Sequence, residues 1–174
     1  MDAAAGGEGD HVDRLRAQWA RELPDLDTEP MGVIGRARRI TLRLRPAIEA
    51  VFTRHGVDAG EFDVISTLLR AGEPWRLTPT ELYRTLMISS GGLTARLNRL
   101  EAAGLIRRCE APEDRRSLLV ELTKAGRAKA EAAFREDMAL ERRLLDGLSV
   151  ADKEQLAALL RKLALSLEAG PAQD

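Results

Sequence analysis

Residues 77–123, LTPTELYRTLMISSGGLTARLNRLEAAGLIRRCEAPEDRRSLLVELT, decide the fold of this chain. Thr78, Pro79 and Glu81 supply an N-cap hydroxyl, a proline at the first helical position and a carboxylate that closes a capping box. A helix is therefore predicted to begin here. The serine pair at 89–90 is expected to cap a second helix, and Gly104 is expected to end it.

The second helix is predicted to have one apolar face and one small, polar face. Leu93, Leu97 and Leu100 recur at i, i+4 and i+7, which places them on one buried stripe. The opposite face is narrow and polar enough to enter a major groove. The residues expected to contact DNA from this helix and the turn before it are Ser90, Gly91, Thr94, Asn98 and Arg99.

A basic hairpin is predicted directly after the two helices. Residues 105–110 and 117–122 have the aliphatic and branched content of short strands. Arg115 and Arg116 lie in the loop between them, where guanidinium groups reach phosphates or a narrow minor groove, although such a pair also suits a solvated turn. The pattern predicts a mainly α protein with a small β-hairpin wing, which is a winged helix-turn-helix.

Composition excludes several other classes of function. The chain of 174 residues fits one domain, and it has neither an 18-residue apolar run nor a signal peptide, so we expect a cytoplasmic protein with no membrane partner. The single Cys109 forms no internal disulfide, and His11 and His55 are too far apart for metal-ligand spacing. Because no nucleophile triad or phosphate loop is present, we expect no enzyme and no cofactor.

Positive charge is concentrated in the predicted DNA-binding region. The formal net charge of the chain is only -1, but residues 84–108 contain five arginines and a single glutamate, Glu101. Such a local patch attracts phosphates, with a strength that falls as salt rises.

The remaining sequence predicts helices on both sides of the DNA-binding region. A small, acidic tail over 1–10 is expected to be disordered. Residues 11–57 contain two predicted helices, the first of them carrying Val12, Leu15 and Trp19 and ending before Pro24. Residues 58–122 form the DNA-binding domain, opened by a capping box at 58–61. Residues 123–170 form helices whose leucine-rich face favours a two-fold dimer.

Residues 77–128 resemble the DNA-binding domain of the MarR family of transcription regulators, and the resemblance extends to nearly the whole chain. Ala111 departs from the family pattern, because many relatives carry an aspartate before Pro112. The resemblance implies a MarR-like homodimer with an extra N-terminal helix, which binds double-stranded DNA at an inverted-repeat operator.

A smaller set of residues resembles one branch of that family. Trp19 in RLRAQWAREL, Asp63 in GEFDVISTLL, Arg96 in LTARLNRL and Arg108 in GLIRRCE are similar to the four-residue set of the urate-responsive branch, which is HucR-like and PecS-like. The resemblance implies that these four residues bind a small anionic effector such as urate. Each also has an ordinary explanation: a core tryptophan, a surface aspartate or a phosphate contact.

Helical periodicity gives an independent indication for Arg96. It lies about 60° from the leucine stripe and so leans toward the protein body. Asp63 lies off the apolar stripe of its own helix, where it faces solvent or an opposite charge. We hypothesise that Asp63 pairs with Arg96 and that a bound anion breaks this pair.

The expected function is that of a repressor released by its ligand. The alternatives are the same scaffold responding to another carboxylate, a phenolic compound or an oxidant acting through Cys109, and a constitutive or architectural DNA-binding protein.

Overall fold

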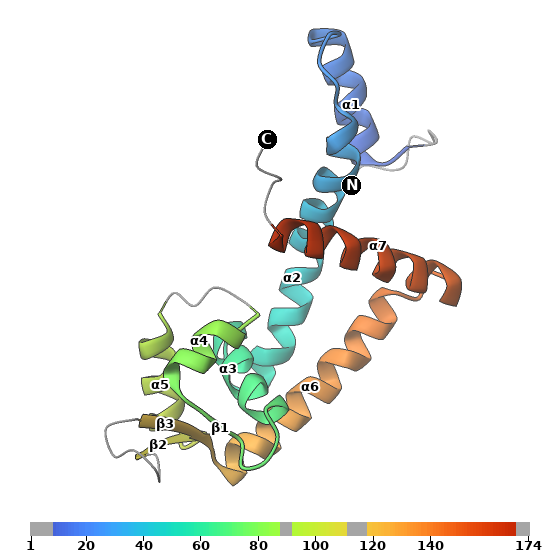
Figure 1. Ribbon diagram of the computed structural model, residues 1–174. Helices are drawn as coiled ribbons and strands as arrows, with labels where there is room; N and C mark the ends of the chain where they lie inside the picture. Colours follow the sequence, from blue (N-terminus) through green and yellow to red (C-terminus); the bar gives the residue numbers. More distant parts are fainter. Residues whose placement is uncertain (1–8, 88–91, 111–117, 170–174) are drawn as a thin grey trace. The chain divides into compact units, whose positions relative to one another are not determined.

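The computed structural model describes residues 9–87, 92–110 and 118–169. They form α1 (His11–Glu22), the π-helical turn η1 (Met31–Gly35), α2 (Arg36–Arg54), α3 (Ala59–Arg70), β1 (Arg76–Leu77), α4 (Pro79–Thr85), α5 (Leu93–Ala102), β2 (Ile106–Glu110), β3 (Leu118–Leu122), α6 (Lys124–Leu144) and α7 (Val150–Glu168) (Figure 1). The chain divides into two compact units, Met1–Ala47 and Ile48–Asp174, with the boundary inside α2.

The second unit contains a winged helix-turn-helix, as the sequence predicts. Asp58 and Glu61 form a reciprocal capping box at the start of α3. Thr78 and Glu81 do the same at the start of α4, with Pro79 at the first helical position. Both helices begin where their side chains satisfy the backbone N–H groups that the first turn leaves without partners.

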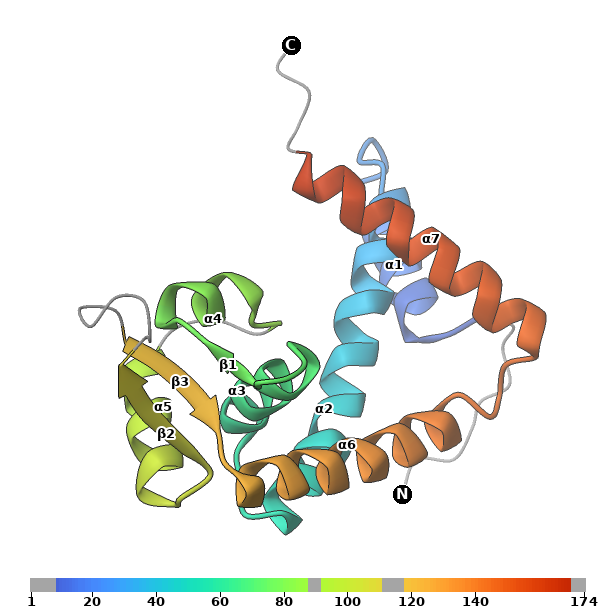
Figure 2. The ribbon, with the colours of Figure 1, turned by 60° about the horizontal axis from the view of Figure 1, so that its bottom comes forward.

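The wing is a three-stranded antiparallel sheet in the order β1-β3-β2 (Figure 2). Ile106, Val120 and Leu122 are buried on its inner face, whereas Arg107 and Glu121 lie opposite each other on the outer face. The predicted hairpin is confirmed. β1 was not predicted, because a strand of two residues is too short to show alternation.

The start of α5 differs from the prediction. Gly92 is its N-cap residue, with a φ of 76°, and no side chain among the described residues caps the helix. The predicted serine cap is therefore wrong, and both serines lie outside the described residues. Glycine suits this position because a residue without a Cβ adopts positive φ without strain. Asp10, expected in the tail, instead caps α1.

α6 packs against α3, and its first turn lies against Leu105 and Leu122 at the ends of the wing hairpin. A Cβ at Gly126 would overlap the carbonyl oxygen of Leu105, so only glycine permits this approach. Ala130 and Ala133 continue the small, buried face of α6. The helix then ends at Leu144, and Ser149 caps α7 through a capping box with Asp152.

α6 also buries one carboxylate at an energetic cost. The Asp137 residue is 5% exposed, and its Oδ1 has no hydrogen-bond partner in the part of the chain that the structure describes. Burial, and secondarily the charge of Glu141, raises the pKa of Asp137 to about 6. Between its ordinary value and pH 6 the folded protein binds a proton that the unfolded chain does not, so the charged carboxylate destabilises the fold above pH 6.

We predict that Asp137→Asn stabilises the protein at neutral pH. The free energy of unfolding should rise by about 1 to 3 kcal/mol at pH 7.5 and much less at pH 4, where the folded carboxyl is protonated and the unfolded one is close to its ordinary pKa of 3.8. Urea denaturation at the two pH values measures this difference. The exposed Asp146→Asn serves as the matched control and should change little. An equal change at both pH values for Asp137→Asn would contradict the account.

Candidate functional site

α5 has the two faces that the sequence predicts. Leu97 and Leu100 are 4% and 1% exposed, and Leu93 packs partly buried beside them. Thr94 and Asn98 lie on the exposed side. The helix therefore presents a small, polar surface of the kind that enters a major groove.

Arg99 is engaged by the first turn of α3. Its Nε donates to Glu61 Oε1 at 2.5 Å, and its Nη2 lies 3.0 Å from Asp58 Oδ2. The hydrogen bond that Arg99 donates to Glu61 raises the pKa of Arg99, and the charge of Asp58 adds to this effect. Arg99 thus braces α5 against α3 through Nε and Nη2, and a DNA contact through this side chain would use Nη1 or replace one of these carboxylates.

Arg108 joins the wing to α5. Its Nη2 donates to Asn98 Oδ1 at 2.6 Å, and its Nη1 donates to Glu101 Oε2 at 2.9 Å. The backbone N–H of Arg108 donates to the other oxygen of Glu101 at 3.1 Å. Arg108, which is predicted to bind the ligand, is therefore bonded to Asn98, which is predicted to contact DNA.

The positive patch is weaker than the sequence count implies. Arg99 pairs with Glu61 and Arg107 with Glu121, at 2.6 Å in the second case. Both carboxylates lie outside the segment 84–108 in the sequence, although the fold brings them beside it. We correct the prediction accordingly, since three of the five arginines in that segment are paired with carboxylates.

Four of the predicted DNA contacts lie outside the described residues. They are Ser90 and Gly91, before α5, and Arg115 and Arg116, in the loop between β2 and β3. Their roles stay predictions.

Asp63 is buried where α3 meets the segment after α4. Asp63 is 6% exposed, and its Oδ1 accepts a hydrogen bond of 3.3 Å from the backbone N–H of Met87. Of the two surroundings that the sequence left open for Asp63, its burial excludes solvent, and an opposite charge stays a prediction. The hydrogen bond links α3 to the connection between α4 and α5.

Arg96 leans toward the protein body, as its helical position predicts. Its guanidinium lies against Gly60 on α3, where a Cβ would overlap it. A glycine three residues before Asp63 was the sequence signal for this close approach. The proposed pairing of Asp63 with Arg96 stays a hypothesis.

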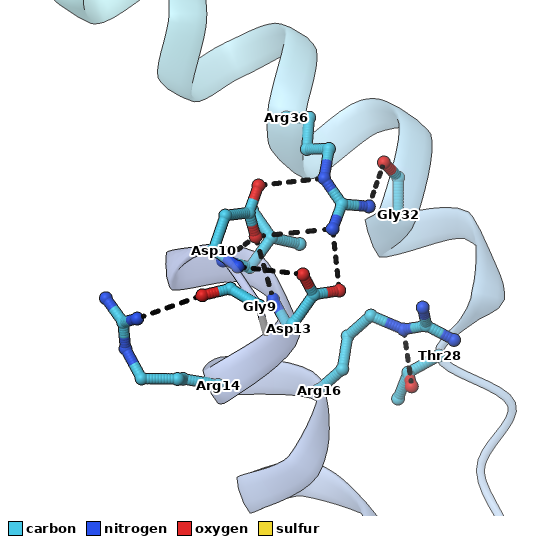
Figure 3. Close-up of polar contacts among 9 residues, drawn as sticks. Gly9, Asp10, Asp13, Arg14, Arg16, Thr28, Gly32 and Arg36 are labelled. Atoms are coloured by element: carbon cyan, nitrogen blue, oxygen red, sulfur yellow. Dashed lines mark hydrogen bonds and ion pairs between the residues drawn. The ribbon is translucent and has the colours of Figure 1, made fainter. Parts of the chain in front are cut away.

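Trp19 lies on α1, in the first compact unit, and is 45% exposed, so it is not a core residue. Arg36 holds α1 against η1 and the start of α2 (Figure 3). Its Nε lies 2.8 Å from Asp10 Oδ2, its Nη2 lies 2.6 Å from Asp13 Oδ1, and its Nη1 donates to the Gly32 carbonyl at 3.0 Å. The hydrogen bond from Arg36, followed by that from the Asp13 backbone, lowers the pKa of Asp10 to about 2.

Cys109 lacks the surroundings of a reactive thiol. Its Sγ lies 3.6 Å from Glu121 Oε2, and burial, with this carboxylate, raises its pKa. A raised pKa lowers the thiolate fraction on which oxidation depends. In the described ranges we find no group of three or more side chains suited to a metal ion. Within the same ranges, each helix is too short or too polar to cross a membrane.

Comparisons with known proteins agree with this geometry. Residues 55–117 match the MarR family profile MarR_2. The chain is 41% identical over 152 residues to the HTH-type transcriptional regulator PecS of Dickeya dadantii, covering 87% of this chain and 92% of PecS. It is 34% identical to the multiple antibiotic resistance protein MarR of Salmonella typhimurium, covering 62% of this chain and 73% of that protein.

Solved structures with the same fold include two regulators. AbsC, a MarR family transcriptional regulator from Streptomyces coelicolor, has a TM-score of 0.68 and 25% identity, covering 83% of this chain and 98% of AbsC. A MarR variant from Escherichia coli, complexed with operator DNA, has a TM-score of 0.64 and 25% identity. The match covers 83% of this chain and 96% of the MarR variant.

We predict that Arg36→Ala loosens α1. Losing both carboxylate contacts should speed proteolytic cleavage within residues 23–30 several-fold, as limited digestion at acidic residues would show. The exposed Arg38→Ala on the same helix is the matched control. The pKa of Asp10 is lowered from its ordinary value of 3.8 to about 2. The stabilisation from the Asp10–Arg36 contact is therefore fully present above pH 3.8 and is lost as the pH falls toward 2, so the wild-type protein should still resist cleavage at pH 5. Equal acceleration in both variants would show that Arg36 has no special role.

Proposed function

The chain belongs to the PecS-like branch of the MarR family of DNA-binding transcription regulators, and on that basis we propose that it is a homodimeric repressor that a small anionic ligand releases from an inverted-repeat operator. The observation that carries the DNA-binding part is α5 itself, which is anchored by buried leucines and presents Thr94 and Asn98 outward. Arg115 and Arg116 are proposed to contact phosphate or the minor groove beside it.

The proposal of a dimer rests on the surface of α7. No residue of this helix, all of which lies in the described part of the chain, is buried. The leucines of its predicted stripe remain largely exposed, at 42% for Leu156, 58% for Leu159 and 52% for Leu160. A second copy of the chain supplies an equivalent surface, and a two-fold axis presents two copies of α5 to one face of the DNA.

We predict a dimer whose two half-sites lie about one helical turn, 10 to 10.5 bp, apart. Leu160→Glu should weaken both dimerisation and operator binding by placing a charge in the interface. Ala158→Glu adds the same charge to the opposite side of α7 and should leave both unchanged. Sedimentation and footprinting measure the two properties. A monomer at working concentration, or a footprint on one half-site alone, would contradict the proposed dimer.

The proposed ligand residues are Trp19, Asp63, Arg96 and Arg108, and urate is the proposed effector. Support comes from the branch to which the chain belongs and from the contacts of Arg108. An anion that binds this guanidinium competes with Glu101 and Asn98, and it thereby acts on α5. Such a ligand shifts DNA affinity only by its differential affinity for the bound and released states.

We predict that urate titrated into the operator complex releases the DNA at submillimolar concentration. Trp19→Ala should raise the concentration needed about tenfold, because an aromatic wall over a planar ligand is lost. Leu23→Ala, an exposed truncation just after α1, is the control and should behave as wild type. Indistinguishable curves for Trp19→Ala and wild type, or no release at millimolar urate, would favour another carboxylate, a phenol or constitutive binding. The raised pKa of Cys109 argues against the remaining alternative, an oxidant that acts through this thiol.

A further inference from the structure

Arg108 determines which end of the Asn98 side chain points away from the protein. The two residues come from different elements, β2 and α5, and Nη2 of Arg108 donates to Oδ1 of Asn98 at 2.6 Å. Glu101 accepts from Nη1 of the same guanidinium with one oxygen and from the backbone N–H of Arg108 with the other. The arginine is thus fixed by two bonds before it reaches the asparagine.

The chemistry of the two side chains allows only one orientation of the Asn98 amide in this hydrogen bond. A guanidinium has N–H donors and no acceptor, whereas the asparagine amide has an acceptor oxygen at one end and a donor NH₂ at the other. Arg108 can therefore bond only to Oδ1, which leaves the NH₂ group of the exposed Asn98 for a partner outside the protein.

We propose that Arg108 is a positioning residue that makes Asn98 a hydrogen-bond donor toward DNA. This rests on the proposed function, in which α5 reads the major groove. A donor suits the acceptors on the major-groove edges of guanine, adenine and thymine, whereas cytosine presents its N4 amino donor there. The two-bond pairing of asparagine with adenine uses the amide oxygen as well, and here Arg108 takes one of the two acceptor positions of that oxygen and orients it toward the wing. The operator position read by Asn98 should therefore reject cytosine.

Arg107 provides a matched control on the same strand. It pairs with Glu121 on the outer face of the sheet, opposite in register, and it is the immediate sequence neighbour of Arg108. Arg107→Gln and Arg108→Gln remove the same charge one residue apart, but only the second removes the bond to Asn98. A nonspecific phosphate effect should appear in both variants.

The test begins with the full-length protein and a random DNA library, from which the operator is selected. Affinities are then measured for the operator, for each of its single-base variants and for random DNA. Asn98→Ala should lose about tenfold discrimination at one position in each half-site. Arg108→Gln should lose discrimination at that same position, the double variant should lose no more, and Arg107→Gln should keep the wild-type base profile.

A second variant tests the proposal with Arg108 unchanged. Asn98→Asp keeps an oxygen for the guanidinium but presents another acceptor outward, so the base preference should shift toward cytosine, whatever the loss in overall affinity. This experiment does not require Arg108→Gln to fold, which thermal unfolding of each variant checks.

Three results would overturn the inference. Arg108→Gln could weaken operator and random DNA equally, as a phosphate contact does. It could alter the profile at a position other than the one set by Asn98. Asn98→Asp could also leave the preference unchanged. Wild-type protein that selects no sequence from the library would instead refute the proposed function, so the two failures are distinguishable.

Discussion

The ion pair between Arg108 and Glu101 connects the wing to α5, the helix that we propose reads DNA, and the geometry of the candidate interface depends on it. Buried Leu97 and Leu100 fix which side of α5 faces the core, but a leucine stripe alone leaves the polar side chains above it unconstrained. The bonds from β2 fix one of them, Asn98. Arg99 adds a brace to α3 on the same helix. The exposed face of α5 is thereby organised before DNA arrives, which lowers the entropy lost on binding.

The same pairing limits how much charge the protein brings to DNA. An arginine already bonded to a carboxylate gains less from a phosphate, because the carboxylate offsets its charge and repels the phosphate. With Arg99, Arg107 and Arg108 all paired, binding relies more on shape, on hydrogen bonds and on the proposed contacts of Arg115 and Arg116. Paired arginines would also give the proposed anionic ligand a route to α5, since it would compete with the carboxylate that holds the guanidinium. These two consequences fit a regulator whose DNA affinity is meant to be adjustable.

Local sequence signals predicted most of the fold, and long-range contacts account for what they missed. The capping boxes at Asp58 and Thr78 are complete within four residues, so the starts of α3 and α4 were predictable. Gly92 was missed because two serines nearby offered a more familiar cap. The burial of Asp63 depends on a backbone N–H 24 positions away, and the partner of Arg107 lies 14 positions away. The hydrophobic periodicity of a single helix or strand does not indicate such long-range contacts. Arg96 is the exception, since its angle on the helix alone indicated that it leans inward.

The most direct test of this account is the structure of the full-length protein bound to its selected operator. The account predicts that Oδ1 of Asn98 stays on Arg108, that Glu101 keeps its two bonds to that arginine, and that the Asn98 NH₂ group lies within hydrogen-bond distance of an acceptor on a base edge. A complex in which Arg108 leaves Glu101 for a phosphate, and in which Asn98 turns its oxygen toward the base, would contradict it.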